Sequence, residues 1–230
     1  MNRTLDVVTS TLVSGLTAAQ GYYVFHHARQ PEQMLELYEF EACPFCRKVR
    51  EGLSALDLDA KIYPCPPNGT RYRPEAIALG GQKQFPLLVD PNTNRRLYES
   101  EQILRYLATT YGDGRLPLAL RLGPLSTLRS AAGGIARPSR FRATPSKAPK
   151  AALELWSFEA SPFCRIVRES LSRLELPYVL HNVAKKSQKR DAFVAKSGKM
   201  MVPFLVDPNT DTAMFESADI VRYLERTYGA

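Results

Sequence analysis

Short runs of mostly apolar residues alternate along the chain with segments in which apolar residues recur every three or four positions. Residues 35–40 form one such run, rich in leucine and aromatic side chains, which predicts a strand. In the following segment Val49, Leu53 and Leu56 lie at helical spacing, which predicts a helix that packs one apolar stripe against a sheet. Pro44 stands where the first turn of this helix is expected, a position that suits proline.

The same reading continues to the end of the first half of the chain. We predict strands at 61–63, 87–89 and 96–98, helices at 74–79 and 100–111, and a hairpin turn at 90–93. The predicted order of elements is therefore β-α-β-α-β-β-α.

An internal repeat organises the whole sequence. Residues 40–51 recur as residues 158–169 with only two differences. Further matches pair residues 86–93 with 203–210 and residues 99–112 with 216–229. Because the matches extend over a whole set of elements, we infer that a complete domain has been duplicated.

Four segments follow from the repeat. We expect an N-terminal helical extension at 1–34, domain 1 at 35–112, a basic linker with a possible helix at 113–152, and domain 2 at 153–230. Residues 4–19 could form an amphipathic helix, and residues 137–150, rich in proline, serine and basic residues, favour a flexible or extended linker.

The net charge of +8 comes almost entirely from the linker. Asp113 is its only acidic residue, against eight lysines and arginines, and the rest of the chain is close to neutral. We interpret this charge as solvation of the linker rather than as an anion or RNA site, and expect no nucleic-acid partner.

Other features narrow the class of protein. No apolar run approaches the roughly 20 residues of a membrane-spanning helix, and no secretory signal is recognisable, so neither is expected. Four cysteines are too few for a disulfide scaffold. They favour a reducing compartment, the cytoplasm, and thiol chemistry.

The pair Cys43 and Cys46 carries the predicted chemistry. A cysteine just before a helix faces unpaired N–H groups and the positive end of the helix dipole, which favours the thiolate. Arg47 and Lys48 add positive charge nearby. Cys43 is then the nucleophile, and Cys46, one turn further on, can resolve a mixed disulfide.

Zinc binding, or two buried structural thiols, are the alternatives for this pair. We expect no metal, because a structural zinc site usually needs a second close pair of ligands. The remaining candidates are isolated: Cys65, Cys164, His26, His27 and His181. We interpret Cys65 as an ordinary thiol at a strand end, with a third redox role as the alternative.

On these residues each repeat resembles a glutaredoxin, or equally the thioredoxin-like N-terminal domain of glutathione transferases. Three separated features carry the resemblance, which covers both repeats. They are Cys-Pro-Phe-Cys at 43–46, the prolines of Phe85-Pro86 and Val202-Pro203, and the pairs Glu99-Ser100 and Glu216-Ser217.

The resemblance implies two glutathione sites. The prolines are expected to be cis, with the backbone of the preceding residue pairing with the cysteinyl part of glutathione. Each Glu-Ser pair is expected to hold the γ-glutamyl group at a helix N-terminus, a plain helix cap being the alternative. The implied site residues are Phe45, Phe85, Pro86, Glu99 and Ser100 in domain 1, and Ser161, Phe163, Cys164, Val202, Pro203, Glu216 and Ser217 in domain 2.

Two departures qualify the resemblance. Ser161 stands at the nucleophile position of domain 2, so dithiol exchange cannot run there. That domain could bind glutathione without turnover, use Ser161 as serine-type transferases do, or serve only in packing. The all-helical second domain of typical glutathione transferases is also missing from this sequence.

We therefore expect a glutathione-dependent thiol–disulfide oxidoreductase acting on a disulfide, with Cys43 as nucleophile, Cys46 as resolving thiol and glutathione as cofactor. One alternative is a transferase or isomerase acting on a small electrophile. The other is a non-catalytic glutathione-binding, scaffold or iron–sulfur-carrying module.

Overall fold

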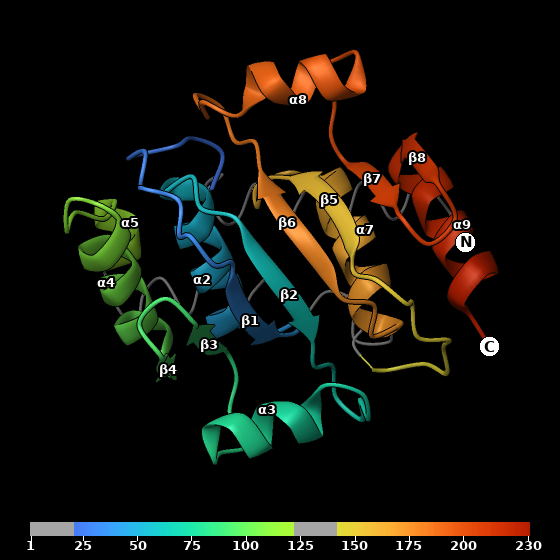
Figure 1. Cartoon of the computed structure of the whole chain (residues 1–230), viewed down its shortest axis with the longest axis horizontal. Helices are drawn as coiled ribbons and strands as arrows, with labels where there is room; N and C mark the ends of the chain where they lie inside the picture. The colour runs from blue at the N-terminus through green and yellow to red at the C-terminus, as the bar shows by residue number, and fades with distance from the viewer. Residues whose placement is uncertain (1–20, 122–141) are drawn as a thin grey trace.

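A single mixed sheet runs through both repeats in the computed structural model, which describes residues 21–121 and 142–230 (Figure 1). Within these residues the sheet has eight strands in the order β4-β3-β1-β2-β6-β5-β7-β8. The amphipathic helix predicted at 4–19 lies outside the described residues.

The first repeat has the predicted order of elements. They are β1 (Leu35–Glu39), α2 (Pro44–Ala55), β2 (Ala60–Pro64), α3 (Arg73–Gly80), β3 (Leu87–Asp90), β4 (Arg95–Leu97) and α4 (Ser100–Tyr111). The predicted bounds of α4 are confirmed, and those of the strands and of α3 differ from the prediction by one residue at one or both ends. A short helix, α5 (Leu118–Arg121), follows in the linker.

The second repeat forms the same series. It consists of β5 (Leu153–Ser157), α7 (Pro162–Arg173), β6 (Tyr178–Asn182), α8 (Arg190–Ser197), β7 (Phe204–Asp207), β8 (Thr212–Phe215) and α9 (Ser217–Tyr228). The duplication of a complete α/β domain of β-α-β-α-β-β-α order is thereby confirmed.

Alternation along the strands divides the apolar residues between the two faces of the sheet. Leu35 and Leu37 of β1 pack with Val49 and Leu53 of α2 in one large core, to which both repeats contribute. Tyr38 points to the opposite face, where it packs under α3. The predicted apolar stripe of α2 is fully buried, as expected for a helix that covers a sheet.

The closing helix of each repeat is tied to the preceding hairpin by a buried carboxylate. Asp90, at the end of β3, accepts hydrogen bonds from the hydroxyls of Tyr106 and Tyr111, each at 2.5 Å. Asp207 accepts the same two bonds from Tyr223 and Tyr228, at 2.6 and 2.5 Å. The repeated aspartate and tyrosines therefore have a structural role.

The repeats join edge to edge through β2 and β6, which pair antiparallel. Lys61 lies opposite Val179 at the centre of this pairing, and these two residues occupy equivalent positions in the repeats. The two halves are therefore related by a pseudo-twofold axis that passes through the β2–β6 ladder. Figure 1 shows its effect, since α3 and α8 lie at opposite ends of the sheet.

The segment that precedes each repeat crosses onto the other repeat. The N–H of Val24 donates to the carbonyl of Lys185 at 2.9 Å, and the N–H of Ala143 donates to the carbonyl of Pro67 at 3.0 Å. Thr144 then donates to the carbonyl of Arg173 at the end of α7, at 2.9 Å. The described part of the linker at 142–152 is thus extended and hydrogen-bonded to both repeats.

Charged side chains are buried between α2, α7 and the segments that precede these two helices. Arg50 of α2 contacts Glu159 with Nε and Oε2 3.0 Å apart, and Arg168 of α7 contacts Glu41 with Nε and Oε2 3.1 Å apart. Burial raises the pKa of Glu159, but the arginines outweigh it and hold this pKa at about 2. Charges this deeply buried are tolerated only when they are paired.

Candidate thiol site at the start of helix α2

Cys43 caps the N-terminus of α2, as the motif predicts. Its Sγ accepts a hydrogen bond from the backbone N–H of Cys46 at 3.2 Å and lies 3.9 Å from the carbonyl oxygen of Phe85. Cys43 is 5% exposed, whereas Cys46 is completely buried. The two thiols therefore differ in access, with the first sulfur near the surface and the second behind it.

The surroundings also separate the two thiols in acidity. A hydrogen bond from the Cys46 thiol lowers the pKa of Cys43, burial opposes this, and the N–H groups of Cys46 and Phe45 add to the lowering. Burial, followed by the same thiol–thiol hydrogen bond, raises the pKa of Cys46 well above its usual value. This order of acidity is the one that a nucleophile and a resolving thiol require.

The basic residues expected to assist Cys43 are engaged elsewhere. Arg47 Nε donates to Glu51 at 2.9 Å, and Lys48, fully buried, forms an ion pair with Glu101. The helix N-terminus and Cys46, rather than these two cations, provide the principal contacts that stabilise a thiolate at Cys43.

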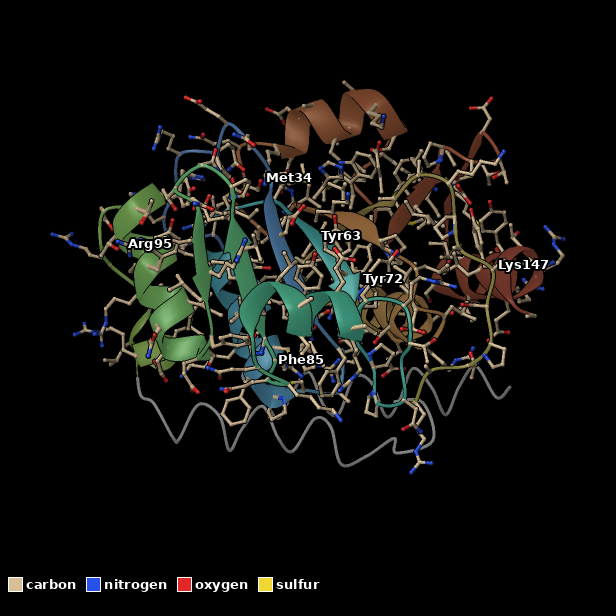
Figure 2. The ribbon with its side chains drawn as sticks, turned by 60° about the horizontal axis from the view of Figure 1, so that its bottom comes forward. Met34, Tyr63, Tyr72, Phe85, Arg95 and Lys147 are labelled. Atoms are coloured by element: carbon tan, nitrogen blue, oxygen red, sulfur yellow. The ribbon has the colours of Figure 1, made fainter. Side chains whose placement is uncertain are left out.

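Both expected cis peptide bonds are present, at Phe85-Pro86 and Val202-Pro203. In the first repeat this bond brings the carbonyl of Phe85 beside Cys43. The Phe85 ring lies against α3 (Figure 2), whose Arg73 guanidinium stands 4.7 Å from the ring centroid. One wall of the site is therefore made by the strand opening and α3.

Glu99 and Glu216 both adopt positive φ angles, 62° and 68°, directly before α4 and α9. Neither side chain makes the capping hydrogen bond to its helix. The helix-cap alternative therefore does not account for these side chains, and both repeats hold the glutamate in the same uncommon backbone conformation.

Contacts connect Glu99 to the thiol site. The side-chain amide of Gln84 donates to the carboxylate of Glu99, and Gln84 directly precedes Phe85, whose carbonyl faces Cys43. Ser100, buried at the first position of α4, follows Glu99. The structure thus brings together the three separated features of the first repeat.

The second repeat reproduces this geometry with oxygen in place of sulfur. Ser161 caps α7, and its Oγ accepts from the N–H of Cys164 at 3.2 Å. Cys164 is completely buried, and burial raises the pKa of its thiol. An exposed aromatic ring follows each cap, Phe45 at 46% and Phe163 at 42% exposure.

Cys65 lies apart from this chemistry. It is buried with Tyr38, Ala76 and Leu87 on the α3 side of the sheet, and burial raises the pKa of its thiol. All four cysteines are free. Among the described residues, no cluster of histidine, cysteine and acidic side chains could hold a metal ion.

The sequence analysis did not select four residues that shape the first site: Glu39, Arg50, Arg73 and Gln84. Glu39 could have been noticed, because a carboxylate on the inward face of an apolar strand needs a buried partner. Arg73 and Gln84 carry no such signal, since only the folded chain brings them beside Phe85 and Glu99.

The fold and the cis-proline site define a thioredoxin-like protein with two domains. A family model described as "Glutathione S-transferase, N-terminal domain" matches residues 37–115 and again residues 155–230. Because the two matches cover more than half of the chain, the protein belongs to this family, with its N-terminal domain present twice in tandem.

Two other comparisons add little to this assignment. A solved structure titled "Leishmania TDR1 - a unique trimeric glutathione transferase" is 13% identical in sequence to this protein. The match covers 84% of this chain and 67% of the chain of that structure, with a TM-score of 0.30. A comparison with curated proteins finds no significant match.

In the described part of the chain, none of the helices has the length and apolar character needed to traverse a bilayer.

Proposed function

We propose that the protein is a glutathione-dependent thiol–disulfide oxidoreductase whose nucleophile is Cys43. The observation that carries this proposal is the position of the Cys43 sulfur, which caps α2 at 3.2 Å from the Cys46 N–H and 3.9 Å from the carbonyl that precedes cis-Pro86. A sulfur in this position is favoured as the thiolate, and in the proposal a disulfide substrate reaches it along the Phe85 backbone.

The substrate disulfide is reduced by two exchanges, and the protein is then regenerated by glutathione. The Cys43 thiolate attacks one sulfur of the substrate disulfide, the substrate S–S bond breaks, and the leaving thiolate takes up a proton. Cys46 then displaces the second half of the substrate and forms the Cys43–Cys46 disulfide. Two glutathione molecules reduce this disulfide and leave as glutathione disulfide, so that substrate reduction is balanced by glutathione oxidation.

Glutathione recognition is assigned to the residues around the cis-proline. In the proposal, the backbone of Phe85 and Pro86 pairs with the cysteinyl part of glutathione, Glu99 and Ser100 hold its γ-glutamyl group, and Phe45 covers it. The strained backbone of Glu99 and its link to Phe85 through Gln84 support this assignment.

The second repeat is proposed to bind glutathione without thiol exchange. Its residues at the positions that correspond to the first site are Ser161, Phe163, Cys164, Val202, Pro203, Glu216 and Ser217. Ser161 can donate a hydrogen bond to the glutathione thiolate but cannot form a disulfide. Because the first site needs reduced thiols, we assign the protein to the cytoplasm.

Reduction of hydroxyethyl disulfide with glutathione tests the proposal. We expect Cys43→Ser to abolish the activity. Cys65→Ala changes a buried thiol outside the site, and we expect this variant to keep the wild-type activity. A Cys43→Ser protein as active as the wild type overturns the proposal. Conjugation of glutathione to a model electrophile without disulfide reduction would instead indicate a transferase, and visible absorption after anaerobic purification would indicate an iron–sulfur carrier.

A further inference from the structure

The two repeats differ at a second chemically important position besides Cys43 and Ser161. The first strand of domain 1 ends at Glu39, whereas the equivalent strand of domain 2 ends at Ser157. A buried carboxylate therefore lies in the repeat that has two thiols and is replaced by a hydroxyl in the repeat that has one.

The second repeat shows what this position contacts. Burial raises the pKa of Cys164, the counterpart of Cys46, while the Ser157 hydroxyl lowers it and accepts from Arg168 Nη1 at 3.3 Å. In the first repeat Arg50 Nη1 contacts Glu39 in the corresponding way. The Glu39 charge acts on both thiols of the pair and raises the pKa of each. Arg50 follows Cys46 by four residues on the buried face of α2, so Glu39, as the partner of Arg50, lies beneath the turn of the helix that carries Cys46.

Burial leaves Cys46 with few ways to lose its proton. Cys46 has no exposed surface, and Glu39 is 2% exposed. A thiol attacks a disulfide only as the thiolate, so the Cys46 proton must move to a group inside the protein. Glu39 is the carboxylate whose negative charge raises the pKa of Cys46.

The acidity of Glu39 suits proton exchange near neutral pH. Burial raises its pKa, Arg50 lowers it, and Glu41 and Glu159 raise it again, to about 7. A general base works best when its pKa is near the working pH. The charged and titratable groups around Glu39 are Arg50 of α2, Glu41, Glu159 and Arg168 at the junction of the repeats, Tyr178 of β6, and the thiols of Cys43, Cys46 and Cys65.

We propose that Glu39 accepts the proton of Cys46 when Cys46 resolves the mixed disulfide on Cys43. This inference rests on the oxidoreductase function proposed above. In the step, the Cys46 S–H bond breaks and its proton passes to the Glu39 carboxylate. The Cys46 sulfur bonds to Cys43 Sγ, and the bond from Cys43 to the substrate sulfur breaks. The leaving thiolate takes up a proton from solvent, and Glu39 afterwards releases the Cys46 proton to solvent, which balances the step.

Two roles of the Glu39 charge predict opposite effects of removing it. If the charge acted only as a neighbour, Glu39→Gln would lower the pKa of Cys46 and speed its attack, because the carboxylate raises that pKa. If Glu39 accepts the proton, Glu39→Gln slows the attack. The direction in which the rate of Cys46 attack changes in Glu39→Gln therefore distinguishes a proton acceptor from a neighbouring charge.

The test follows the Cys43–glutathione adduct by acid quench and intact mass after reduced protein is mixed with glutathione disulfide. For Glu39→Gln we expect the adduct to form and its conversion to the intramolecular disulfide to slow by about tenfold or more at pH 7. The increase in the wild-type resolving rate as the pH rises through about 7 is expected to disappear. Resolution at the wild-type rate or faster, or an equal slowing of adduct formation and resolution, overturns the proposal.

Glu36→Gln is the matched control. Glu36 lies on the same strand but is directed to the opposite face, where its carboxylate accepts from the Tyr63 hydroxyl at 3.2 Å. We expect wild-type adduct formation and resolution for this variant. If its resolution slows as much as that of Glu39→Gln, the effect belongs to the strand and the proposal is overturned.

A second experiment leaves Glu39 in place. In a protein with Cys43→Ser and Ser161→Cys, the adduct forms in the repeat that has Ser157 in place of the carboxylate. We expect this adduct to be resolved by Cys164 at least about tenfold more slowly than the wild-type adduct is resolved by Cys46. Equal rates overturn the proposal. Failure of wild-type Cys43 to form any adduct instead overturns the oxidoreductase function itself, because formation is measured separately from resolution.

Discussion

Arg50 and Glu159 form a buried ion pair between the repeats, with Nε and Oε2 3.0 Å apart and both side chains at most 2% exposed. The pseudo-twofold axis repeats the contact between Arg168 and Glu41. Each repeat therefore supplies one arginine and one carboxylate to the other, as the two subunits of a symmetric dimer do. The second repeat completes the surroundings of the first site even though it lacks the nucleophile.

Loss of this contact is expected to destabilise the whole chain. Glu159→Gln removes one of three carboxylates around Arg50, which keeps Glu39 and Glu41, so we expect a cost of at most about 3–5 kcal/mol, the value for a fully broken buried pair. Urea unfolding measures the change. Glu154→Gln is the control, because Glu154 lies on the same repeat at 36% side-chain exposure and its contact with His181 is worth about 1 kcal/mol or less. Equal unfolding free energies for the two variants would contradict the prediction.

Alkylation by iodoacetamide is expected to distinguish the thiols. Because the pKa of Cys43 is lowered, its reactivity should rise at a lower pH than that of an ordinary thiol, while Cys46 stays unreactive in the folded protein. Cys46→Ala removes the hydrogen bond that contributes most to the lowering, so the inflection should move to higher pH. Peptide mass mapping over a pH series measures both effects, and an unchanged inflection in Cys46→Ala would contradict the assigned cause.

Titration calorimetry with glutathione is expected to count two sites. If both Glu-Ser pairs bind the γ-glutamyl group, Glu99→Ala and Glu216→Ala each leave one site and the double variant leaves none. Asp219→Ala is the control, since Asp219 is an exposed acid in the first turn of α9 that pairs with Arg222. Two sites in the double variant would remove these glutamates from the binding model.

Acid is expected to weaken the fold through the hairpin aspartates. Burial raises the pKa of Asp90, but hydrogen bonds from Tyr106 and Tyr111 outweigh it and lower the pKa below the usual value. A lowered folded-state pKa stabilises the protein above the unfolded value, about 3.9, and the stabilisation is lost as the pH falls through the folded value.

Asp90→Asn tests this linkage. The variant should be less stable than the wild type at neutral pH, and the difference should shrink as the pH falls below about 4. Urea unfolding at several pH values provides the measurement. A stability difference that stays constant down to the lowest pH would show that Asp90 stabilises the hairpin by some means other than its charge.

The local sequence determined each domain. Apolar periodicity placed the helix that follows the first strand, Pro44 marked its first turn, and the repeat supplied an internal check on the elements. The cis conformations at Pro86 and Pro203 were expected from the family resemblance and are confirmed. These features were predictable because periodicity and turn chemistry act between residues that are close in the chain.

The relation between the domains was decided by tertiary structure. The pairing of β2 with β6 and the burial of Arg50 against Glu159 depend on which edges and faces meet, and residues more than a hundred positions apart leave no periodic signal. Glu39 became a candidate proton acceptor only when the fold buried it against Arg50, one helical turn after the fully buried Cys46. The sequence by itself therefore determined two thioredoxin-like domains with a single dithiol pair. Tertiary packing decided that the domains share one sheet and a buried charge cluster, because strand pairing and charge interactions act between residues that are close in space and distant in the chain.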